Sequence, residues 1–311
     1  MISLSPSSLE RVASCPGSYW AEQGLPWQES PYAEEGNLLH AVMGKTATES
    51  QIANLTHEQK LAIRACSDAG RDLVERHISG AKAHIPERKL ECLIDEDVRL
   101  SGRVDYVGID EDAETALVID WKFGRSLEQA AEMNWQLGAY ALLVARNHRV
   151  KRIIVALFQP RVEMERRLTI AEYDEAGIAE TVTTLQHVAA EIRAAKEQAA
   201  RNPGERQCKY CKAAGSKRCP ESQALVQAVA EVSLEAIMPT GAELGRLLHA
   251  AKAASRIADL IESHAKQELR EGREVPGWRL TSGKEIRTLP DAAAAWAKVE
   301  AHMTANEFVS I

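Results

Sequence analysis

Two apolar runs that flank a helical segment constrain the fold of this chain more than any other feature. The runs are TALVIDWKF, residues 115–123, and RIIVALFQP, residues 152–160. Short apolar runs rich in β-branched residues are typical of buried strands. Residues 128–146 between them are predicted to be a helix, and a helix that joins two strands usually makes them parallel neighbours in one sheet. The sequence therefore predicts an α/β core.

Helices and shorter strands are predicted around this core. Capping signals and helical spacing of apolar residues indicate an N-terminal helical region, and runs of strand character follow it. We expect helices at 5–15, from 32, at 56–78, at 178–200 and at 240–272, strands at 89–100 and 102–109, a loop at 201–220, and a hairpin at 277–289 followed by a short Ala-rich helix. Residues 1–221 are predicted to form one domain, and residues 222–311 a mainly helical extension.

Composition excludes several classes of protein. With 45% hydrophobic and 27% charged residues the chain is typical of a globular protein, and its net charge of −7 argues against coating nucleic acid through bulk positive charge. The net charge does not exclude a local basic channel. The Lys/Arg clusters at 146–152 and 161–167 are, however, interpreted as solvated faces. No apolar run approaches the roughly 20 residues of a membrane helix, and no signal-peptide layout opens the chain. We expect a cytoplasmic protein that does not bind membranes.

The stretch LVIDWKFG, residues 117–124, combines strand character with charge. Successive side chains of a strand point to opposite faces, so Leu117, Ile119 and Trp121 share one face while Asp120 and Lys122 share the other. We expect the apolar face to contact the core and the charged face to line a cleft.

The preceding strand repeats the arrangement. In GRVDYVG, Val104 and Tyr106 are predicted on one face, and Arg103 and Asp105 on the other. Neighbouring strands lie about 4.8 Å apart, so in a suitable register Asp105 and Asp120 converge on one hard cation. Two carboxylates and an ammonium group suit metal-assisted hydrolysis of a phosphodiester. The alternative is a salt bridge on an edge strand.

Two helical pairs add polar groups. Gly36 and His40 share a helix face, which leaves room for a metal or phosphate beside the imidazole. Gln136 and Tyr140 are also four residues apart, and both are able to hydrogen-bond a lysine, a phosphate or a base.

Taken together, these motifs resemble the PD-(D/E)xK nucleases, and within them the RecB-like exonucleases that include CRISPR-associated iron–sulfur nucleases and phage relatives. The resemblance covers roughly residues 3–221. Its motifs occur here in order as EEGNLLH at 34–40, GRVD at 102–105, IDWK at 119–122 and QLGAY at 136–140. The Pro that often precedes the first Asp is absent.

The resemblance implies a restriction-endonuclease-like core and a deoxyribonuclease that uses Mg²⁺ or Mn²⁺. The metal ligands would be His40, Asp105, Asp120 and the carbonyl of Trp121, and Lys122 would position the attacking water. Relatives often carry a supporting acidic residue at the position of Glu91, although a solvated strand residue is the alternative. Gln136 and Tyr140 would complete the catalytic group.

The resemblance also implies a biological setting. Relatives mostly degrade DNA from its ends, often as single strands, so we expect an exonuclease of phage recombination, repair or replication in the bacterial host cytoplasm. Its partners would be DNA and phage proteins of those processes. The resemblance leaves the oligomeric state undecided. We expect aromatic residues near the cleft to stack unpaired bases. The candidates are Trp20, Trp121, Trp135 and Tyr140, of which one or two are expected to lie in the core instead.

Six cysteines in a reducing compartment are metal ligands or core residues rather than disulfides. Cys208, Cys211 and Cys219 have the spacing C-x₂-C-x₇-C, which suits a metal but lacks a fourth ligand. The resemblance supplies it, because the iron–sulfur relatives use one cysteine far upstream, where this chain has Cys15. It implies a [4Fe–4S] cluster; a Cys₄ or Cys₃His zinc site is the alternative. Two cysteines are predicted to lie in the core, Cys66 and Cys92.

A second function of a different class stays open. A nucleic-acid-binding or scaffold protein could keep the fold without catalysis. The presence of Asp105, Asp120 and Lys122 favours the enzyme.

Overall fold

The computed structural model describes residues 1–26, 31–81, 83–196, 201–230 and 241–280. The chain divides into two compact units, Met1–Ala265 and Lys266–Ile311. The predicted strands and the catalytic motifs all belong to the first unit. The predicted boundary at residue 221 stays a prediction.

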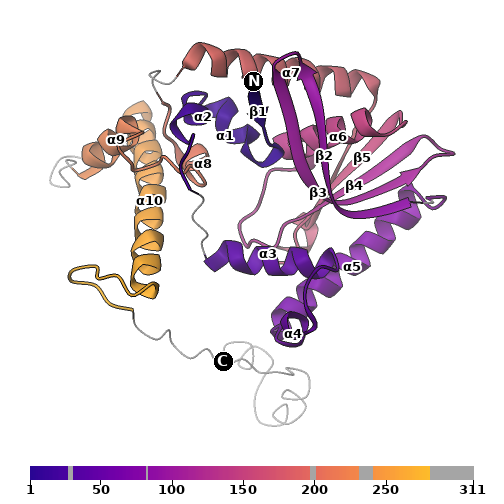
Figure 1. Ribbon diagram of the computed structural model, residues 1–311, viewed down its shortest axis with the longest axis horizontal. Helices are drawn as coiled ribbons and strands as arrows, with labels where there is room; N and C mark the ends of the chain where they lie inside the picture. Colours follow the sequence, from indigo (N-terminus) through magenta and orange to yellow (C-terminus); the bar gives the residue numbers. More distant parts are fainter. Residues whose placement is uncertain (27–30, 82, 197–200, 231–240, 281–311) are drawn as a thin grey trace, which may run out of the picture. The chain divides into compact units, whose positions relative to one another are not determined.

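Within the described part of the chain, six strands form one mixed sheet (Figure 1). The strands are β1 Ile2–Leu4, β2 Ala83–Asp95, β3 Val98–Asp110, β4 Thr115–Trp121, β5 Arg152–Phe158 and β6 Leu168–Tyr173. β3 pairs antiparallel with β2 along most of its length and antiparallel with β4 at its far end, and it pairs parallel with β1 at its start. β4 and β5 are parallel, and β5 and β6 are antiparallel. The predicted α/β core is therefore confirmed.

The described residues also form helices, some of which cover the two faces of this sheet. They are α1 Leu9–Ser14, α2 Gly17–Ala21, α3 Pro31–Met43, α4 Glu49–Ala53, α5 His57–His77, α6 Trp135–Asn147, α7 Glu175–Ala195, α8 Glu205–Cys208, α9 Pro220–Ala230 and α10 Gly241–Arg270, with 3₁₀ turns η1 Pro6–Ser8, η2 Ala131–Met133 and η3 Met164–Arg166. As predicted, α6 connects the parallel strands β4 and β5. None of the described helices is both long and apolar enough to cross a bilayer.

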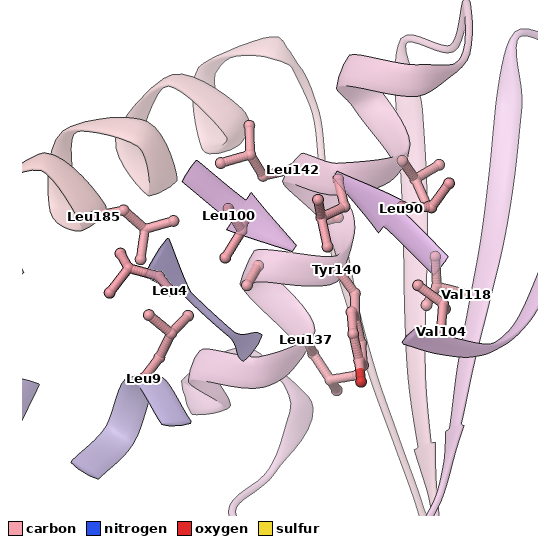
Figure 2. Packing of buried hydrophobic residues seen from close by; sticks show 14 of the residues in the cluster. Leu4, Leu9, Leu90, Leu100, Val104, Val118, Leu137, Tyr140, Leu142 and Leu185 are labelled. Carbon is pink, nitrogen blue, oxygen red and sulfur yellow. The ribbon is translucent and has the colours of Figure 1, made fainter. Parts of the chain in front are cut away.

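Two apolar cores hold the layers together. One core joins the sheet to α1, α6 and α7, and Figure 2 shows Leu9, Leu137, Leu142 and Leu185 of these helices beside Leu100 of β3. The other core joins the opposite face of the sheet to α3 and α5. Burying apolar side chains stabilises such layers by about 25 cal/mol for each Å² removed from water. The strand β4 is buried along its whole length because helices cover both of its faces.

Several boundaries differ from the sequence-based expectation. The predicted strands 89–100 and 102–109 are wrong as drawn, because β2 and β3 form a long hairpin that turns at residues 96–97, where the Asp97 amide donates to the Asp95 carboxylate. β1, β6, α4 and α9 were not expected; β1 has three residues and β6 is only half-buried, so neither has a strong apolar pattern. α6 begins at Trp135 rather than at 128. Thr240, most of the hairpin at 277–289 and the Ala-rich helix lie outside the described residues.

Candidate active site

Asp105 and Asp120 meet where the pairing of β3 with β4 ends. Tyr106 of β3 pairs with Ile119 of β4, so the next residue on each strand brings Asp105 opposite Asp120. β3 pairs with β1 only up to Leu100 and with β4 only from Tyr106. Between these two pairings, residues 101–105 of β3 have no partner residue in β1 or β4. The register that the two-aspartate prediction required is present.

A chain of polar contacts surrounds Asp120. Lys122 Nζ lies 2.9 Å from Asp120 Oδ2 and donates to Gln136 Oε1 at 2.9 Å. Gln136 Nε2 donates to Asp120 Oδ1 at 3.2 Å and to the Tyr140 hydroxyl at 2.8 Å. Tyr140 in turn donates to the carbonyl of Arg103 at 2.9 Å. Four of the predicted site residues thus form one connected group.

A second set of contacts surrounds Asp105. Its Oδ2 accepts from the Trp121 amide at 2.9 Å, and its Oδ1 lies 3.2 Å from His40 Nδ1. The His40 ring packs edge-on against Phe123, with ring centroids 5.1 Å apart. These contacts bring α3 to the ends of β3 and β4, so His40 reaches the acidic pair from a helix more than sixty residues away in the chain.

Local structure fixes the α6 side of the site. Asn134 is the N-cap of α6, and its Oδ1 accepts from the amides of Gln136 and Leu137 at 3.0 and 3.2 Å. This cap sets where the first turn begins and therefore where the Gln136 side chain points. The sequence analysis missed Asn134, although Asn directly before an apolar helix is a recognisable N-cap signal.

Steric contacts explain why position 102 of the GRVD motif is a glycine. A Cβ on Gly102 would lie 2.7 Å from the ring of Pro6 and 3.3 Å from Tyr140. Only glycine lets the N-terminal 3₁₀ turn and α6 approach β3 this closely. At Gly36, by contrast, a Cβ would meet nothing within 4 Å, so the space beside it is open.

Burial shifts the acid–base properties of the group. Burial raises the pKa of Asp120 to about 6, against the attraction of Lys122. Burial alone lowers the pKa of Lys122, but the attraction of Asp120, helped by Asp105 and Glu128, outweighs it, so the pKa is raised. Burial similarly lowers the pKa of His40, and the contact with Asp105 outweighs it and raises the pKa. Lys122 therefore stays cationic, and Tyr140, whose pKa burial raises well above its ordinary value, stays a neutral donor.

The face pattern was predicted correctly for β4 and incorrectly for β3. Leu117, Ile119 and Trp121 all belong to the core beneath α3 and α5, as expected. Val104 belongs to the core beneath α6, whereas Tyr106 packs against the other core, so these two residues do not share a face. The change of face falls at Asp105, which explains how its carboxylate reaches His40 on α3.

The structure does not bring Glu91 to the group. The register places it opposite Ser101, four residues before Asp105 on β3. Its carboxylate is 57% exposed and pairs with Arg99 Nη2 at 2.8 Å.

Among the aromatics expected to stack bases, Trp121 and Tyr140 are buried in the cores. Trp20 is half-buried and donates its indole N–H to Ile192 O at 2.8 Å.

The donor chemistry of the group fits a hard divalent cation. Two carboxylates and an imidazole are oxygen and nitrogen ligands of the kind that Mn²⁺ and Mg²⁺ sites use. Asp120 Oδ2 is buried and receives no aligned hydrogen bond from the described residues; its contact with Lys122 is an ion pair. In their present positions no three His, Cys, Asp or Glu side chains of the described residues form a ready ligand group. His40 and Asp105 instead pair with each other.

Four cysteines far apart in the sequence gather at another place. Cys15 lies at the end of α1, Cys208 in α8, Cys211 in the next turn and Cys219 before α9, and all four are buried free thiols. Asn202 N donates to Cys15 Sγ at 3.2 Å, and Gly204 N donates to Cys208 Sγ at 3.3 Å.

The mutual electrostatic influence of these thiols indicates that they are neighbours, although no three of them form a ready metal-ligand group within the described residues. Burial raises the pKa of Cys15, and Cys219 adds to the rise. Burial also raises the pKa of Cys208, with contributions from Cys219 and Cys15. Burial raises the pKa of Cys211 to about 12. Cys66 is fully buried in the core beneath α5, and Cys92 is half-buried against the other core, as predicted.

Two hollows lie near β4. The larger, of about 600 Å³, is lined mainly by apolar residues of α5 and the sheet, and none of Asp105, Asp120 and Lys122 lines it. A smaller hollow of about 280 Å³ lies beside the segment that follows β4. It is lined by Arg125, Leu127, Arg161, Val162, Glu163 and Arg166. Three of these six are arginines. Arg125 pairs with Glu58, and Arg161 pairs with Glu35 and Glu58.

Solved structures resemble this chain only remotely. The protein SSO0001 is 15% identical over 68% of this chain and 84% of its own, with a TM-score of 0.33. A putative exonuclease from Eubacterium rectale is 11% identical over 61% and 81%, with a TM-score of 0.39. An alkaline exonuclease from Laribacter hongkongensis is 12% identical over 62% and 88%, with a TM-score of 0.31. Likeness at this level carries no inference about activity.

The family comparison reaches much further along the chain. The profile of the family described as "Protein of unknown function (DUF2800)" matches residues 2–310. The match includes the sheet, the acidic pair, all four gathered cysteines and the C-terminal region. The chain therefore belongs to the DUF2800 family.

Proposed function

We propose that this protein is a divalent-metal-dependent deoxyribonuclease, acting as an exonuclease on DNA ends and favouring single strands. The observation that carries the proposal is the convergence of Asp105, Asp120 and Lys122 at the end of β4, with Lys122 Nζ 2.9 Å from Asp120. A structural surface ion pair does not require this environment. Asp120 is 2% exposed, and burying an ionised carboxylate costs free energy even when it is paired.

Each residue then has a chemical role. A divalent cation held by Asp105, Asp120, His40 and the Trp121 carbonyl would polarise the scissile phosphate and lower the pKa of a water molecule. Lys122 orients that water and offsets negative charge as the phosphorus–oxygen bond breaks. Gln136 keeps the ammonium group in place, and Tyr140 keeps Gln136 in place. Glu91 has no role in this scheme.

The four cysteines are proposed to hold a [4Fe–4S] cluster, with structural zinc as the alternative. Cysteine thiolates in a set of four suit either group, and backbone N–H groups directed at sulfur support both. Asn202 and Gly204 supply such N–H groups. The cluster would join the start of the nuclease domain to its end.

The biological setting that goes with this proposal is phage recombination, repair or replication in a bacterial cytoplasm. DNA would be the principal partner, and phage proteins of those processes would be further partners. No contact in the described structure bears on these partners.

The test is cleavage of end-labelled single- and double-stranded DNA with Mn²⁺, with Mg²⁺ and with EDTA. We expect metal-dependent loss of label from linear strands and little cutting of circular single strands. Lys122→Ala and Asp120→Asn should abolish cleavage while circular dichroism shows an intact fold. Lys151→Ala is the matched control, because Lys151 belongs to an exposed ion pair with Glu114. DNA binding without cleavage would favour the scaffold function instead.

A further inference from the structure

Tyr210 is an exposed aromatic residue between two fixed points. Its side chain is 64% exposed, whereas Cys208 and Cys211, two residues before and one after, are 4% and 7% exposed. The Cys211 amide donates to the Cys208 carbonyl at 3.3 Å, and Cys208 Sγ accepts from Gly204 N. A tight turn with buried ends therefore holds the ring at the surface, where a tyrosine gains little from the hydrophobic effect.

A cation accompanies the ring. Lys209 Nζ lies 5.0 Å from the centroid of the Tyr210 ring, within the range of a cation–π contact. The same Nζ lies 3.9 Å from Glu128 Oε1. This ion pair connects the cysteine turn to the segment that follows β4.

That segment also connects to the candidate active site. Glu128 lies six residues after Lys122, on the segment that follows β4. The Glu128 amide is fixed by Gln159 Oε1 at 3.0 Å. Arg125 and Leu127 of the same segment line the arginine-rich hollow. Lys209 and the Tyr210 ring beside it therefore adjoin the segment that begins after Lys122 and that lines the arginine-containing hollow.

We propose that Tyr210 is a stacking platform for one unpaired base of a single-stranded DNA substrate, with Lys209 and the arginine-lined hollow contacting its phosphates. This inference rests on the proposed nuclease function and adds strand preference to it. Every base has a flat π face, so stacking on tyrosine is independent of sequence. Bases of a duplex are already stacked on each other, so the platform selects single strands.

Binding without catalysis gives the first test. Dissociation constants of fluorescent single-stranded and duplex oligonucleotides are measured in EDTA by anisotropy. Tyr210→Ala should weaken single-strand binding roughly 5- to 150-fold, the range that corresponds to losing one stacked base. Duplex binding should stay within about twofold, and Tyr210→Phe should bind single strands within about twofold of the natural chain, because the ring is retained. Trp278→Ala is the control, since Trp278 is 75% exposed and lies in the other unit.

A scan with one abasic site gives the second test. When the missing base is the one that stacks on Tyr210, the natural chain should bind the abasic strand more weakly than the intact strand. Tyr210→Ala should bind the abasic and intact strands with equal affinity. This non-additivity identifies the partner of the ring, because residues that act together do not give additive losses. A merely structural role of Tyr210 would lower affinity equally at every abasic position.

Several outcomes would overturn the inference. Equal loss of single-strand and duplex binding, a Phe variant as weak as the Ala variant, or an unchanged Ala variant each contradicts a stacking role. If the protein cleaves DNA but Tyr210→Ala binds normally, only this inference fails. If no cleavage is found but the abasic scan shows coupling, the binding platform stands and the nuclease proposal fails.

Discussion

At the scale of single residues, Asp120 has the least ordinary environment. It is 2% exposed, its pKa is raised to about 6 by burial, and its Oδ2 has only an ion pair with Lys122. A carboxyl group whose pKa is higher in the folded than in the unfolded chain stabilises the fold when protonated. That stabilisation is complete below the unfolded value of 3.8 and is lost as the pH rises through about 6.

The metal-free protein should therefore show this dependence, measured against a variant that cannot titrate. Relative to Asp120→Asn, the free energy of unfolding of the natural chain in EDTA should fall by about 2 kcal/mol between pH 4.5 and 7.5. Urea denaturation at several pH values measures the difference. A difference that stays flat, or rises with pH, would show that the Asp120 pKa is not raised.

Gly102 gives a steric prediction. Gly102→Ala should lower the free energy of unfolding by about 1–3 kcal/mol, because the new methyl group overlaps the Pro6 ring 2.7 Å away. Gly36→Ala is the matched control: its Cβ meets nothing, and alanine favours a helix by roughly 0.5–1 kcal/mol. Thermal or urea unfolding of the two variants should move in opposite directions.

At the scale of elements, α6 positions the catalytic group through its N-cap. Asn134→Ala removes the acceptor for two amides and should cost about 1 kcal/mol of stability. Because Gln136 is in the first turn and holds Lys122, cleavage should also fall by about 3- to 10-fold. Asp174→Ala at the N-cap of α7 is the control, since Asp174 accepts from Gly177 N and caps a helix that carries none of the site residues. It should lose comparable stability and keep its cleavage rate.

The elements also show where sequence patterns succeed. α5 begins with the expected capping box of Thr56 and Gln59, and α6 joins parallel strands as predicted. The hairpin of β2 and β3 was divided at the wrong residue, because both strands are long and only partly buried. Apolar and polar residues do not alternate strongly in these two strands, so the sequence pattern did not predict the position of the turn.

At the scale of the whole molecule, the four cysteines connect the first twenty residues to residues 202–222. If they hold a metal group, Cys208→Ala should remove it and lower the melting temperature substantially, because metal affinity contributes to folding stability. Cleavage should be lost as a consequence, unlike in Lys122→Ala, where stability is kept. Elemental analysis for iron and zinc, with the visible spectrum of anaerobically purified protein, distinguishes the two metals. Cys92→Ala is the control, because half-buried Cys92 lies on β2, away from the four.

The family resemblance supplied Cys15 and the roles of His40, Gln136 and Tyr140. Local patterns in the sequence determined the α/β class, the crossover helix, the core face of β4 and the motifs that contain Asp105, Asp120 and the three clustered cysteines. They did so because periodicity, caps and spacing act over a few residues. The tertiary structure alone decided that Asp105 stands opposite Asp120, that His40 reaches them, that Glu91 does not, and that Tyr210 rather than Trp121 presents an exposed ring. These depend on strand register and on packing between residues up to two hundred positions apart. No local pattern encodes such distances, and the point where β3 changes face is set by its neighbours on both sides.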